Sequence, residues 1–358
     1  MGTVKAAVCR EFGAPLSLED VDLRGPEGRE VEVTLGAVAI CHSDISFMDG
    51  AWGGALPAVY GHEAAGTVTA VGSAAQGYAP GDAVIVTLIR ACGHCASCGS
   101  GAPVLCLSPR KDTGPLSIGG EAVAQGMDCG AFAEKVVVDQ SQIAKVPDEM
   151  AADAAALLAC GVVTGVGAVV NTANVRPGQC IVVIGAGGVG LNAIQGARIA
   201  GAARIVAVDM VPEKLDMARD FGATDGILAT EEKPWKALRQ MTGRLADAVF
   251  VTVGAIPAYE SAPRLLAPGG SIYMVGMPHS GDTARYEPVV LAALGQGMIG
   301  TKMGDTVLAR DIPWMVDLYA QDRLKLDELI SGRWRFDQIN EAIADTRSGA
   351  ARRNVIVF

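Results

Sequence analysis

Four cysteines stand close together in one short stretch of the sequence: Cys92, Cys95, Cys98 and Cys106. Two sulfurs of a C-x-x-C pair can reach one ion at about 2.3 Å, and Zn²⁺ favours four tetrahedral thiolates. Because four thiolates close the coordination shell, the pattern predicts a structural zinc site. The spacing alone leaves two alternatives open, an iron–sulfur cluster and a site in which His94 is a ligand.

A second set of metal-binding residue types is dispersed along the chain, at Cys41, at the pair His62 and Glu63, and at Cys160. Catalytic zinc keeps three protein ligands and one open position, and two cysteines with one histidine are a known set. Spacing alone does not assemble these residues, and a lone cysteine is more often a small buried side chain. From the residues themselves, a second metal site therefore stays open.

A glycine-rich motif follows the apolar run at 181–184, and it comprises Gly185, Gly187, Gly188, Val189 and Gly190. In the pattern G-x-G-x-x-G, the glycines permit a tight turn, the approach of a pyrophosphate and close packing of helix on strand. The phosphates then meet the free N–H groups at the start of a helix. Asp209 stands 19 residues after Gly190, which is the usual place of a ribose-binding carboxylate. The combination predicts dinucleotide binding.

The elements that must position these residues are of two kinds. Up to about residue 146, apolar patterns between Gly and Pro turns predict strands at 31–35, 66–72 and 83–86. From about residue 153, strand patterns alternate with helix patterns such as 189–200; the strands are expected at 181–184, 205–208, 248–253 and 271–275. Such alternation predicts βαβ units and a doubly wound parallel sheet. The apolar end of the chain, 354–358, predicts a strand that returns to the first module.

The composition supports two folded domains. The chain has 358 residues, of which 50% are hydrophobic and 19% charged, so it is not of disordered type and can bury two cores. Its net charge of −10 opposes binding to phosphate backbones, and we expect no nucleic-acid partner. The 45 glycines fit turns and close backbone approaches.

The sequence also bears on location. The segment 1–8 lacks the apolar core of a signal peptide, and Ala6 argues against myristoylation at Gly2. Residues 154–170 carry no charge, but the stretch is short for a membrane span and rich in Ala, Gly and Val. We therefore expect a buried helix, no membrane partner, and a cytoplasmic protein whose nine cysteines stay reduced.

Taken together, the motifs resemble those of the zinc-dependent alcohol dehydrogenases of the medium-chain dehydrogenase/reductase family. The triplet Gly61-His62-Glu63, the cysteine loop, the Cys160 segment and the glycine motif follow one another in the family's order, and the resemblance covers essentially the whole chain. It implies an α/β fold with two domains. One is a GroES-like, β-rich catalytic domain, residues 1–161 completed by 302–358. The other is a Rossmann NAD-binding domain with a doubly wound parallel sheet, residues 162–301.

The resemblance implies two zinc ions per chain. The catalytic ion would be held by Cys41, His62 and Cys160, with Glu63 as an adjacent carboxylate that coordinates occasionally. Asp44 would orient His62 from behind, as carboxylates orient many metal-binding histidines. The structural ion would be held by the four clustered cysteines, and this excludes the iron–sulfur alternative.

The resemblance also implies NAD as the cofactor. His42 and Arg353 would contact the pyrophosphate, and Asp209 and Lys214 would hold the adenosine ribose. Val253 and Val275 complete the cofactor-binding positions together with the glycine motif.

In the implied reaction, zinc polarises the alcohol oxygen and a hydride passes to the nicotinamide. The hydroxyl of Ser43 passes the proton on, because it can accept and donate at once. Many family members carry a histidine three positions further along, where this chain has Ser46. Ribose hydroxyls and water are then expected to complete the relay.

The resemblance places Ser43, Trp52, Leu88 and Met277 in the substrate pocket. Large apolar walls favour primary or aromatic alcohols and their aldehydes. Alternatives on the same scaffold are a polyol or amino-alcohol dehydrogenase and a glutathione-dependent formaldehyde dehydrogenase. A non-catalytic relative that only binds the dinucleotide is disfavoured. Such a relative would be expected to lose the catalytic zinc ligands, whereas this chain has them. The family resemblance suggests a homodimer or homotetramer.

Overall fold

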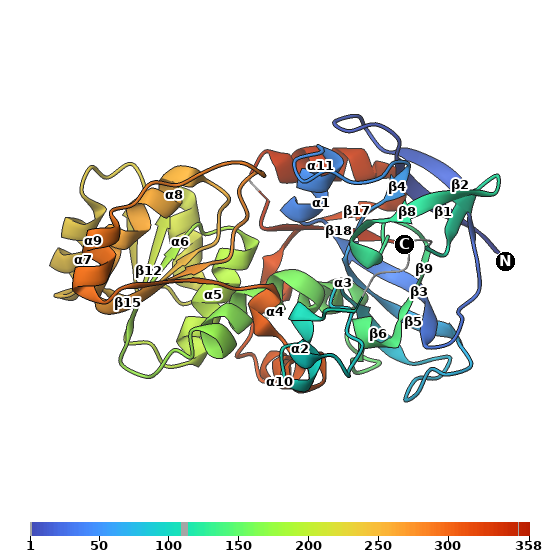
Figure 1. The fold of residues 1–358 in the computed structure, drawn as a ribbon, viewed down its shortest axis with the longest axis horizontal. Coiled ribbons are helices and arrows are strands. Elements are labelled where there is room, and N and C mark those ends of the chain that lie inside the picture. The colour runs from blue at the N-terminus through green and yellow to red at the C-terminus, as the bar shows by residue number, and fades with distance from the viewer. Residues whose placement is uncertain (1, 109–113, 350) are drawn as a thin grey trace. The chain divides into compact units, whose positions relative to one another are not determined.

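The computed structural model describes residues 2–108, 114–349 and 351–358, and the chain divides into two units (Figure 1). Unit 1 consists of Met1–Gly161 and Val307–Phe358, and unit 2 of Val162–Thr306. Unit 1 is rich in β-structure, whereas unit 2 is built on a six-stranded sheet. The expected fold class, a GroES-like part and a Rossmann part, is confirmed.

Unit 1 contains a closed barrel and a seven-stranded sheet. The barrel has the order β1-β2-β7-β8-β4, formed by β1 (Gly2–Cys9), β2 (Ser17–Leu23), β7 (Leu116–Ile118), β8 (Glu121–Gln125) and β4 (Ala58–Val59). The sheet has the order β10-β6-β5-β3-β18-β17, and β9 also pairs with β3. Its strands are β10 (Ile143–Lys145), β6 (Ala83–Val86), β5 (Glu63–Val71), β3 (Glu30–Ala39), β18 (Arg353–Val357), β17 (Ile330–Arg335) and β9 (Lys135–Asp139).

The three strands that the sequence predicted in this part are confirmed as β3, β5 and β6. In β3 the side chains of Val31, Val33 and Leu35 are buried while their neighbours are half-buried, as the alternating pattern requires. The predicted return of the chain end is also confirmed, because β18 pairs antiparallel with β3. In Figure 1 the red end of the chain accordingly lies among the blue strands of its beginning.

The helices of unit 1 are between four and 13 residues long. They are α1 (His42–Met48), α2 (Ala96–Gly99), α3 (Ala152–Leu157), α10 (Leu308–Ala320) and α11 (Ile339–Arg347), with the 3₁₀ turns η1 (Pro103–Leu105), η2 (Gly126–Asp128), η3 (Gln140–Gln142), η8 (Asp327–Leu329) and η9 (Phe336–Gln338).

Unit 2 is a parallel sheet of order β13-β12-β11-β14-β15-β16. Its strands are β11 (Cys180–Ile184), β12 (Arg204–Asp209), β13 (Asp225–Leu228), β14 (Ala246–Val251), β15 (Leu266–Met274) and β16 (Gly297–Gly300). Its helices are α4 (Val163–Gly167), α5 (Gly188–Ile199), α6 (Pro212–Asp220), α7 (Pro234–Thr242), α8 (Ile256–Ser261) and α9 (Pro288–Leu294), with the turns η6 (Ala262–Leu265) and η7 (Met303–Asp305) and the π-helical turn η5 (Ala168–Thr172). The predicted strands and the predicted helix at 189–200 lie at β11, β12, β14, β15 and α5.

The boundary between the units corrects one expectation. Residues 302–306, which we expected in the returning segment of the catalytic domain, belong to unit 2. The reason is a close backbone contact, because a Cβ on Gly167 would stand 2.5 Å from the carbonyl oxygen of Gly304. The side-chain amide of Asn171 also donates to that carbonyl at 3.0 Å. The segment is therefore fixed to α4 and η5.

Within the described ranges, one helical run, Ala152–Thr172, is long and apolar enough to cross a membrane by length and composition. It contains α3, α4, η5 and the π-helical turn η4 (Leu158–Val162). Of its most apolar window, 89% is buried within the protein. The run is therefore packed as a core helix, as the sequence led us to expect.

Candidate functional site

The dispersed metal-binding residues come together in unit 1. One donor atom each of Cys41, His62, Glu63 and Cys160 lies within 4.8 Å of the others, and all four residues are buried. The Nε2 atom of His62 lies 3.3 Å from the sulfur of Cys160. Two ligands of one tetrahedral zinc ion stand about 3.5–3.8 Å apart, given bond lengths of about 2.0–2.3 Å. The cluster therefore has the dimensions of a site for a single ion.

Three separate backbone turns deliver these side chains. Cys41 follows β3 and is the N-cap of α1, His62 directly precedes β5, and Cys160 lies in the π-helical turn η4. Such widened turns recur at functional sites. Gly61 has a φ of +92°, and a Cβ there would lie 2.6 Å from the backbone nitrogen of Phe132. Only glycine therefore lets the chain enter β5 with the imidazole turned into the cluster.

Asp44 fixes two of these turns with one buried carboxylate. It accepts hydrogen bonds from the backbone N–H groups of Cys41 at 3.1 Å and Gly61 at 2.9 Å. It also lies 2.9 Å from Nδ1 of His62. The carboxylate selects the tautomer with the proton on Nδ1 and leaves the lone pair of Nε2 toward the cluster. This geometry matches the orienting role that the resemblance gave to Asp44.

The buried groups of the cluster shift the pKa values of one another. The hydrogen bond with Cys160 holds the pKa of Cys41 well below its usual value. The same bond, together with burial, raises the pKa of Cys160 well above its usual value. Burial raises the pKa of Glu63 to about 8, although the charge of Arg353 opposes the rise. Several negative charges in this small buried volume are therefore unfavourable without a counter-ion, and a bound cation would remove that cost and favour the ionised ligands.

The surroundings of Glu63 give a direct test of whether the residues fit a zinc ion. Both carboxylate oxygens are buried and accept no hydrogen bond from the described residues. The nearest cation is Arg353, whose Nη2 lies 3.6 Å from Oε1, beyond ordinary hydrogen-bond distance. A buried carboxylate is costly without such partners. Two thiolates, an imidazole and this carboxylate form a donor set that zinc accepts, so the residues fit a catalytic ion.

The proposed proton carrier lies beside this cluster. The hydroxyl oxygen of Ser43 is 3.7 Å from the sulfur of Cys41, and the side chain is half-buried. Ser46, which stands where many relatives have histidine, is half-buried on the same helix. The structure therefore brings Ser43 to the cluster, whereas its outer relay stays a prediction.

The predicted pocket residues belong to different units. Trp52 and Leu88 are half-buried in unit 1, and Met277 is in unit 2 with 57% of its surface exposed. Their joint role in one pocket stays a prediction.

An aromatic cluster in unit 1 was missed. Phe47 packs edge-on against Trp52, with ring centroids 5.0 Å apart, and stacks on Tyr60 at 6.1 Å. Phe47 stands four residues after Ser43, and on a helix such residues share one face. From this spacing, the sequence analysis could have placed Phe47 on the same helix face as Ser43.

The four-cysteine loop forms a second cluster, in which all four sulfurs lie within 4.8 Å of one another. The sulfurs of Cys92 and Cys98 are 4.0 Å apart, and those of Cys95 and Cys106 are 3.9 Å apart. Backbone N–H groups, first that of Leu107, donate to Cys95 and lower its pKa to about 6. Such donors stabilise thiolates. The loop therefore fits a closed four-thiolate zinc site.

Two histidines near these clusters do not belong to them. His94, the alternative ligand, is exposed, and its Nδ1 lies 2.9 Å from the backbone oxygen of Cys92. His42 is exposed on the first turn of α1. Its expected contact with a pyrophosphate stays a prediction.

In unit 2 the glycine motif joins β11 to α5. A Cβ on Gly190 would stand 1.7 Å from the carbonyl oxygen of Gly185, which itself has a φ of +98°. Asp209 ends β12, and its carboxylate accepts hydrogen bonds from the backbone N–H groups of Ala186 at 2.7 Å and Val211 at 3.1 Å. Strand, glycine turn, helix start and acidic side chain are thus assembled as in a dinucleotide-binding unit.

The remaining predicted cofactor residues of unit 2 lie near this turn in the topology. Val253 and Val275 follow the carboxyl ends of β14 and β15, the edge at which open parallel sheets bind ligands. Val253 contacts the first glycine turn, since a Cβ on Gly185 would stand 2.4 Å from its Cγ1. Lys214 is half-buried on α6. Arg353 belongs to unit 1, and its pyrophosphate contact stays a prediction.

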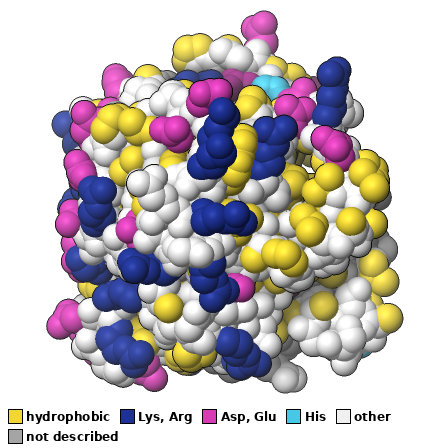
Figure 2. Space-filling view, turned by 90° about the vertical axis from the view of Figure 1, so that its left-hand side faces the viewer, with side chains coloured by type: hydrophobic (Ala, Val, Ile, Leu, Met, Phe, Trp, Pro, Cys, Tyr) yellow, Lys and Arg dark blue, Asp and Glu magenta, His cyan; other side chains and the backbone are white. Residues whose placement is uncertain are grey.

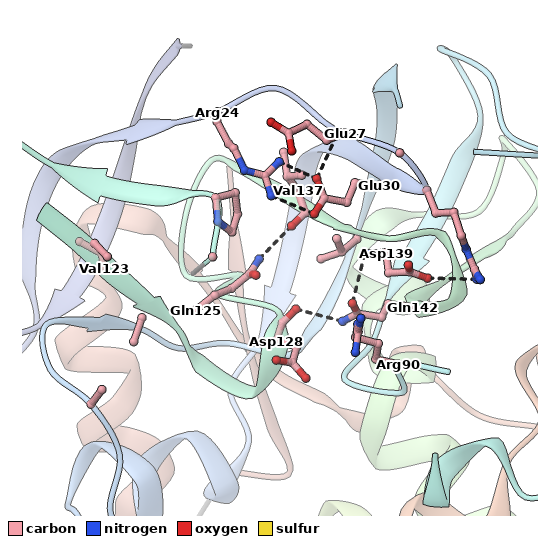
Figure 3. A pocket seen from close by; sticks show the side chains of 18 of the residues that line it. Arg24, Glu27, Glu30, Arg90, Val123, Gln125, Asp128, Val137, Asp139 and Gln142 are labelled. Carbon is pink, nitrogen blue, oxygen red and sulfur yellow. Dashed lines mark hydrogen bonds and ion pairs between the residues drawn. The ribbon is translucent and has the colours of Figure 1, made fainter. Parts of the chain in front are cut away.

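A cavity of about 660 Å³ lies elsewhere in unit 1, beside β8 and β9 (Figure 3). None of its lining residues belongs to either cysteine cluster. Its charged side chains largely pair with one another, Arg24 with Glu30 at 2.5 Å and Arg29 with Asp139 at 3.4 Å. The cavity therefore offers none of the chemistry found at the metal clusters, and we assign it no part in the reaction.

Comparison with known protein families divides the chain in the same way. The family described as alcohol dehydrogenase GroES-like domain matches residues 27–148. The family described as zinc-binding dehydrogenase matches residues 188–321.

Individual relatives match over nearly their whole length. The geraniol dehydrogenase of Castellaniella defragrans is 34% identical, with 99% of this chain and 98% of the relative covered. The class-3 alcohol dehydrogenase of Myxine glutinosa is 35% identical, with 98% and 97% covered. The crystal structure of the benzyl alcohol dehydrogenase from Acinetobacter calcoaceticus superimposes with a TM-score of 0.94 at 31% identity over 100% of both chains.

Proposed function

Because the chain belongs to the zinc-dependent alcohol dehydrogenases of the medium-chain dehydrogenase/reductase family, we propose that it converts a primary or aromatic alcohol to the aldehyde with NAD, and catalyses the reverse reduction. Oxidation of an alcohol is the reaction of its relatives. The observation that carries the proposal is the buried cluster of Cys41, His62 and Cys160 with the hydroxyl of Ser43 beside it.

We propose two zinc ions per chain. Cys41, His62 and Cys160 would hold the catalytic ion, with Glu63 adjacent, and the four-cysteine loop would hold the structural one. When bound, the catalytic ion supplies a Lewis acid for the alcohol oxygen. Asp44 keeps the imidazole of His62 in the tautomer that the site needs.

The residues of this chain then handle the proton. The oxygen of Ser43 would accept the proton of the substrate hydroxyl and release its own proton, for which a ribose hydroxyl of bound NAD would be the acceptor. Since Ser46 is too weak a base to take that proton at neutral pH, the last transfer goes to water. NAD, when bound, would supply the hydride acceptor, so that the alcohol would lose two electrons and two hydrogens in all.

The proposed substrate class is based on the aromatic side chains near Ser43. Phe47, on the helix that carries the hydroxyl, packs against Trp52, which follows that helix in the chain, and flat unsaturated groups pack well on aromatic side chains. Two of the relatives are named for geraniol and benzyl alcohol, which are primary alcohols with an unsaturated group next to the reacting carbon. The glutathione-dependent formaldehyde dehydrogenase that the family resemblance left as an alternative stays the second candidate.

We further propose that the chain forms a homodimer or homotetramer. Strand β16 is at the edge of the sheet in unit 2, where an unpaired edge invites another chain. Nearby side chains are apolar and exposed, including Val289 at 71%, Tyr286 at 51% and Ile299 at 40%. Figure 2, which views the end of the molecule that carries the labels α7 and α9 in Figure 1, shows hydrophobic side chains gathered beside a field of Lys and Arg.

A panel of alcohols tests the reaction. With NAD and absorbance of NADH as the readout, benzyl alcohol and geraniol should give a higher kcat/KM than hexanol, and sorbitol should be a poor substrate. A clear preference for S-hydroxymethylglutathione or for sorbitol would replace the proposed substrate class.

Elemental analysis tests the metal content. We expect two zinc ions per chain, and Cys41→Ser should lose one of them together with activity while the fold persists. One zinc ion per intact chain would contradict the two-site proposal.

A further inference from the structure

Asn354 is fully buried in β18, and all of its polar side-chain atoms are used. Its Nδ2 donates to Oδ2 of Asp345 at 2.8 Å, to the hydroxyl of Thr346 at 3.0 Å and to the carbonyl oxygen of Ala342 at 3.3 Å. Its Oδ1 accepts a hydrogen bond from the indole nitrogen of Trp334 at 3.1 Å. These partners lie on α11 and β17. One side chain therefore fastens the start of β18 to both neighbouring elements.

The backbone around Asn354 is shaped for this network. A Cβ on Gly332 would stand 2.6 Å from Oδ1 of Asn354 and 2.6 Å from the indole nitrogen of Trp334. The register between β17 and β18 shifts at the same point, since Arg353 pairs with Ile330 and Asn354 with Gly332. An irregularity of this kind re-aims the side chains beside it and is common next to active sites.

Arg353 is the residue that precedes Asn354 on β18. Neighbouring residues of a strand point to opposite faces, so Asn354 faces α11 while Arg353 reaches the metal cluster, 3.6 Å from Glu63. The backbone carbonyl of Asn354 accepts a hydrogen bond from the N–H of Ile40 at 2.9 Å, the residue before Cys41. The backbone of Asn354 thus joins the residue that carries the guanidinium to the residue that precedes the first cysteine of the cluster.

One nitrogen of the guanidinium lacks a hydrogen-bond partner among the described residues. The side chain of Arg353 is only 5% exposed, yet its Nη2 makes no hydrogen bond to any described residue. It lies over Gly161, where a Cβ would stand 2.2 Å from Nη2. With no side-chain hydrogen bond at this nitrogen, its position depends on the backbone from which the arginine extends.

We propose that Asn354 is a positioning residue for alcohol oxidation, which holds Arg353 where its guanidinium meets the pyrophosphate of NAD. The inference rests on the proposed contact between Arg353 and that pyrophosphate. Asn354 does not touch the cofactor, and its effect is transmitted through the start of β18.

Binding of NADH to the zinc-loaded enzyme, followed by fluorescence, tests this role. Asn354→Ala should raise the Kd of NADH about three- to tenfold, as expected when a hydrogen bond to a charged group is weakened, while the zinc content and the kcat at saturating NAD change little. Trp334→Phe removes one bond of the network and should give a smaller rise, which keeps the test valid if the alanine variant folds poorly.

Asn340→Ala is the matched control. Asn340 lies on the same helix, α11, and its side chain bonds both the N–H and the carbonyl of Leu16 at 2.9 Å. This variant should lower Tm without changing the Kd of NADH. An Asn354→Ala variant that behaves in the same way would have only a structural role, and the proposal would be wrong.

A double-mutant cycle tests separately whether Arg353 contacts the pyrophosphate and whether Asn354 positions Arg353. Arg353→Ala alone should weaken NADH binding; an unchanged Kd would refute the proposed pyrophosphate contact and the positioning role with it. If Arg353→Ala weakens binding, Asn354→Ala should add little in that background. Equal effects of Asn354→Ala with and without Arg353 would overturn the positioning role alone.

Discussion

Single residues of the metal cluster each serve more than one neighbour. The carboxylate of Asp44 holds the start of α1, the turn at Gly61 and the imidazole of His62 at once. Gly61 supplies a backbone conformation and a space that no side chain permits. Because Cys41 is the N-cap of α1 and Ser43 lies in its first turn, fixing the start of this helix positions a metal ligand and the proton carrier together. Substitution of Asp44 or Gly61 should therefore disturb the metal ligands and the proton carrier together.

Ser43 gives the clearest test at this scale. Ser43→Ala should lower kcat about 10²–10⁴-fold, the usual contribution of a positioned proton carrier, while the zinc content and the Kd of NADH stay unchanged. Ser43→Thr keeps the hydroxyl and should retain most activity, and Ser46→Ala on the same helix is the control. An unchanged kcat in Ser43→Ala would mean that water carries the proton.

Glu63 should make stability depend on pH when zinc is removed with a chelator. Its pKa is raised to about 8 by burial, against about 4.3 for an unperturbed glutamate. The folded chain then keeps a proton that the unfolded chain releases, so the free energy of unfolding falls as pH rises from about 4.5 to about 8. Glu63→Gln should be more stable than the wild type at pH 8, by on the order of 5 kcal/mol, and not at pH 4.5.

Urea unfolding at several pH values measures this difference. Since all other groups are common to the two proteins, the difference between them isolates residue 63. Parallel curves for Glu63→Gln and the wild type would show that the carboxyl group is ionised in the folded chain.

At the scale of helices and strands, prediction succeeded where a pattern repeats and failed where packing decides. Strand β3 and strand β11 were found because alternation and a continuous apolar run are local signals. Strand β4 has two residues, too few for any periodicity. The π-helical turn that holds Cys160 and the contact between Gly167 and Gly304 depend on neighbours far apart in sequence. For that reason the boundary near residue 302 was misplaced by five residues.

The cysteine loop should be an independent element of stability. Cys95→Ser should remove one zinc ion, because three thiolates and a hydroxyl form a poorer shell, and should lower Tm by about 5 °C or more, since metal binding and folding of such loops are coupled. The second zinc ion and kcat per folded chain should remain. Calorimetry with elemental analysis measures both, and loss of both zinc ions would show that the two sites depend on each other.

The glycine turn between β11 and α5, together with Asp209 at the end of β12, should determine whether the enzyme uses NAD or NADP. The carboxylate of Asp209 lies at the glycine turn, where it can accept hydrogen bonds from both ribose hydroxyls of NAD but repels the 2′-phosphate of NADP. The following residues Met210 and Val211 offer no arginine fork to hold a phosphate.

We therefore expect a preference for NAD of about 10²-fold in kcat/KM, corresponding to a few kcal/mol. Asp209→Gly should reduce the preference for NAD over NADP, mainly because NAD binds more weakly. Glu213→Gln on α6 should leave this preference unchanged. Equal efficiency with NADP in the wild type would show that Asp209 does not contact the ribose.

At the scale of the whole molecule, the family resemblance predicted the metal cluster, which the spacing of its residues could not. Residues 41, 62 and 160 are too far apart for their meeting to follow from local rules, yet the order of all four motifs identified the family and with it the cluster. The return of β18 to β3 was foreseen from one apolar run at the chain end. Asn354 was not foreseen, because an asparagine in a strand carries no signal until its four partners are known. Assembly into oligomers is likewise absent from any local pattern.

Oligomerisation should depend on the apolar face of α9 and β16. Val289 is 71% exposed, and in a symmetric interface the same patch meets its own copy, so Val289→Asp would place two carboxylates in an apolar contact. Light scattering after size exclusion should show an oligomer for the wild type and a smaller species for Val289→Asp, with the Kd of NADH unchanged because the glycine turn is untouched. Leu18→Asp is the matched control, since Leu18 is 43% exposed on β2 of unit 1 and should leave the mass unaltered. A monomeric wild type would refute the oligomer itself, whereas an intact Val289→Asp oligomer would place the interface on another face.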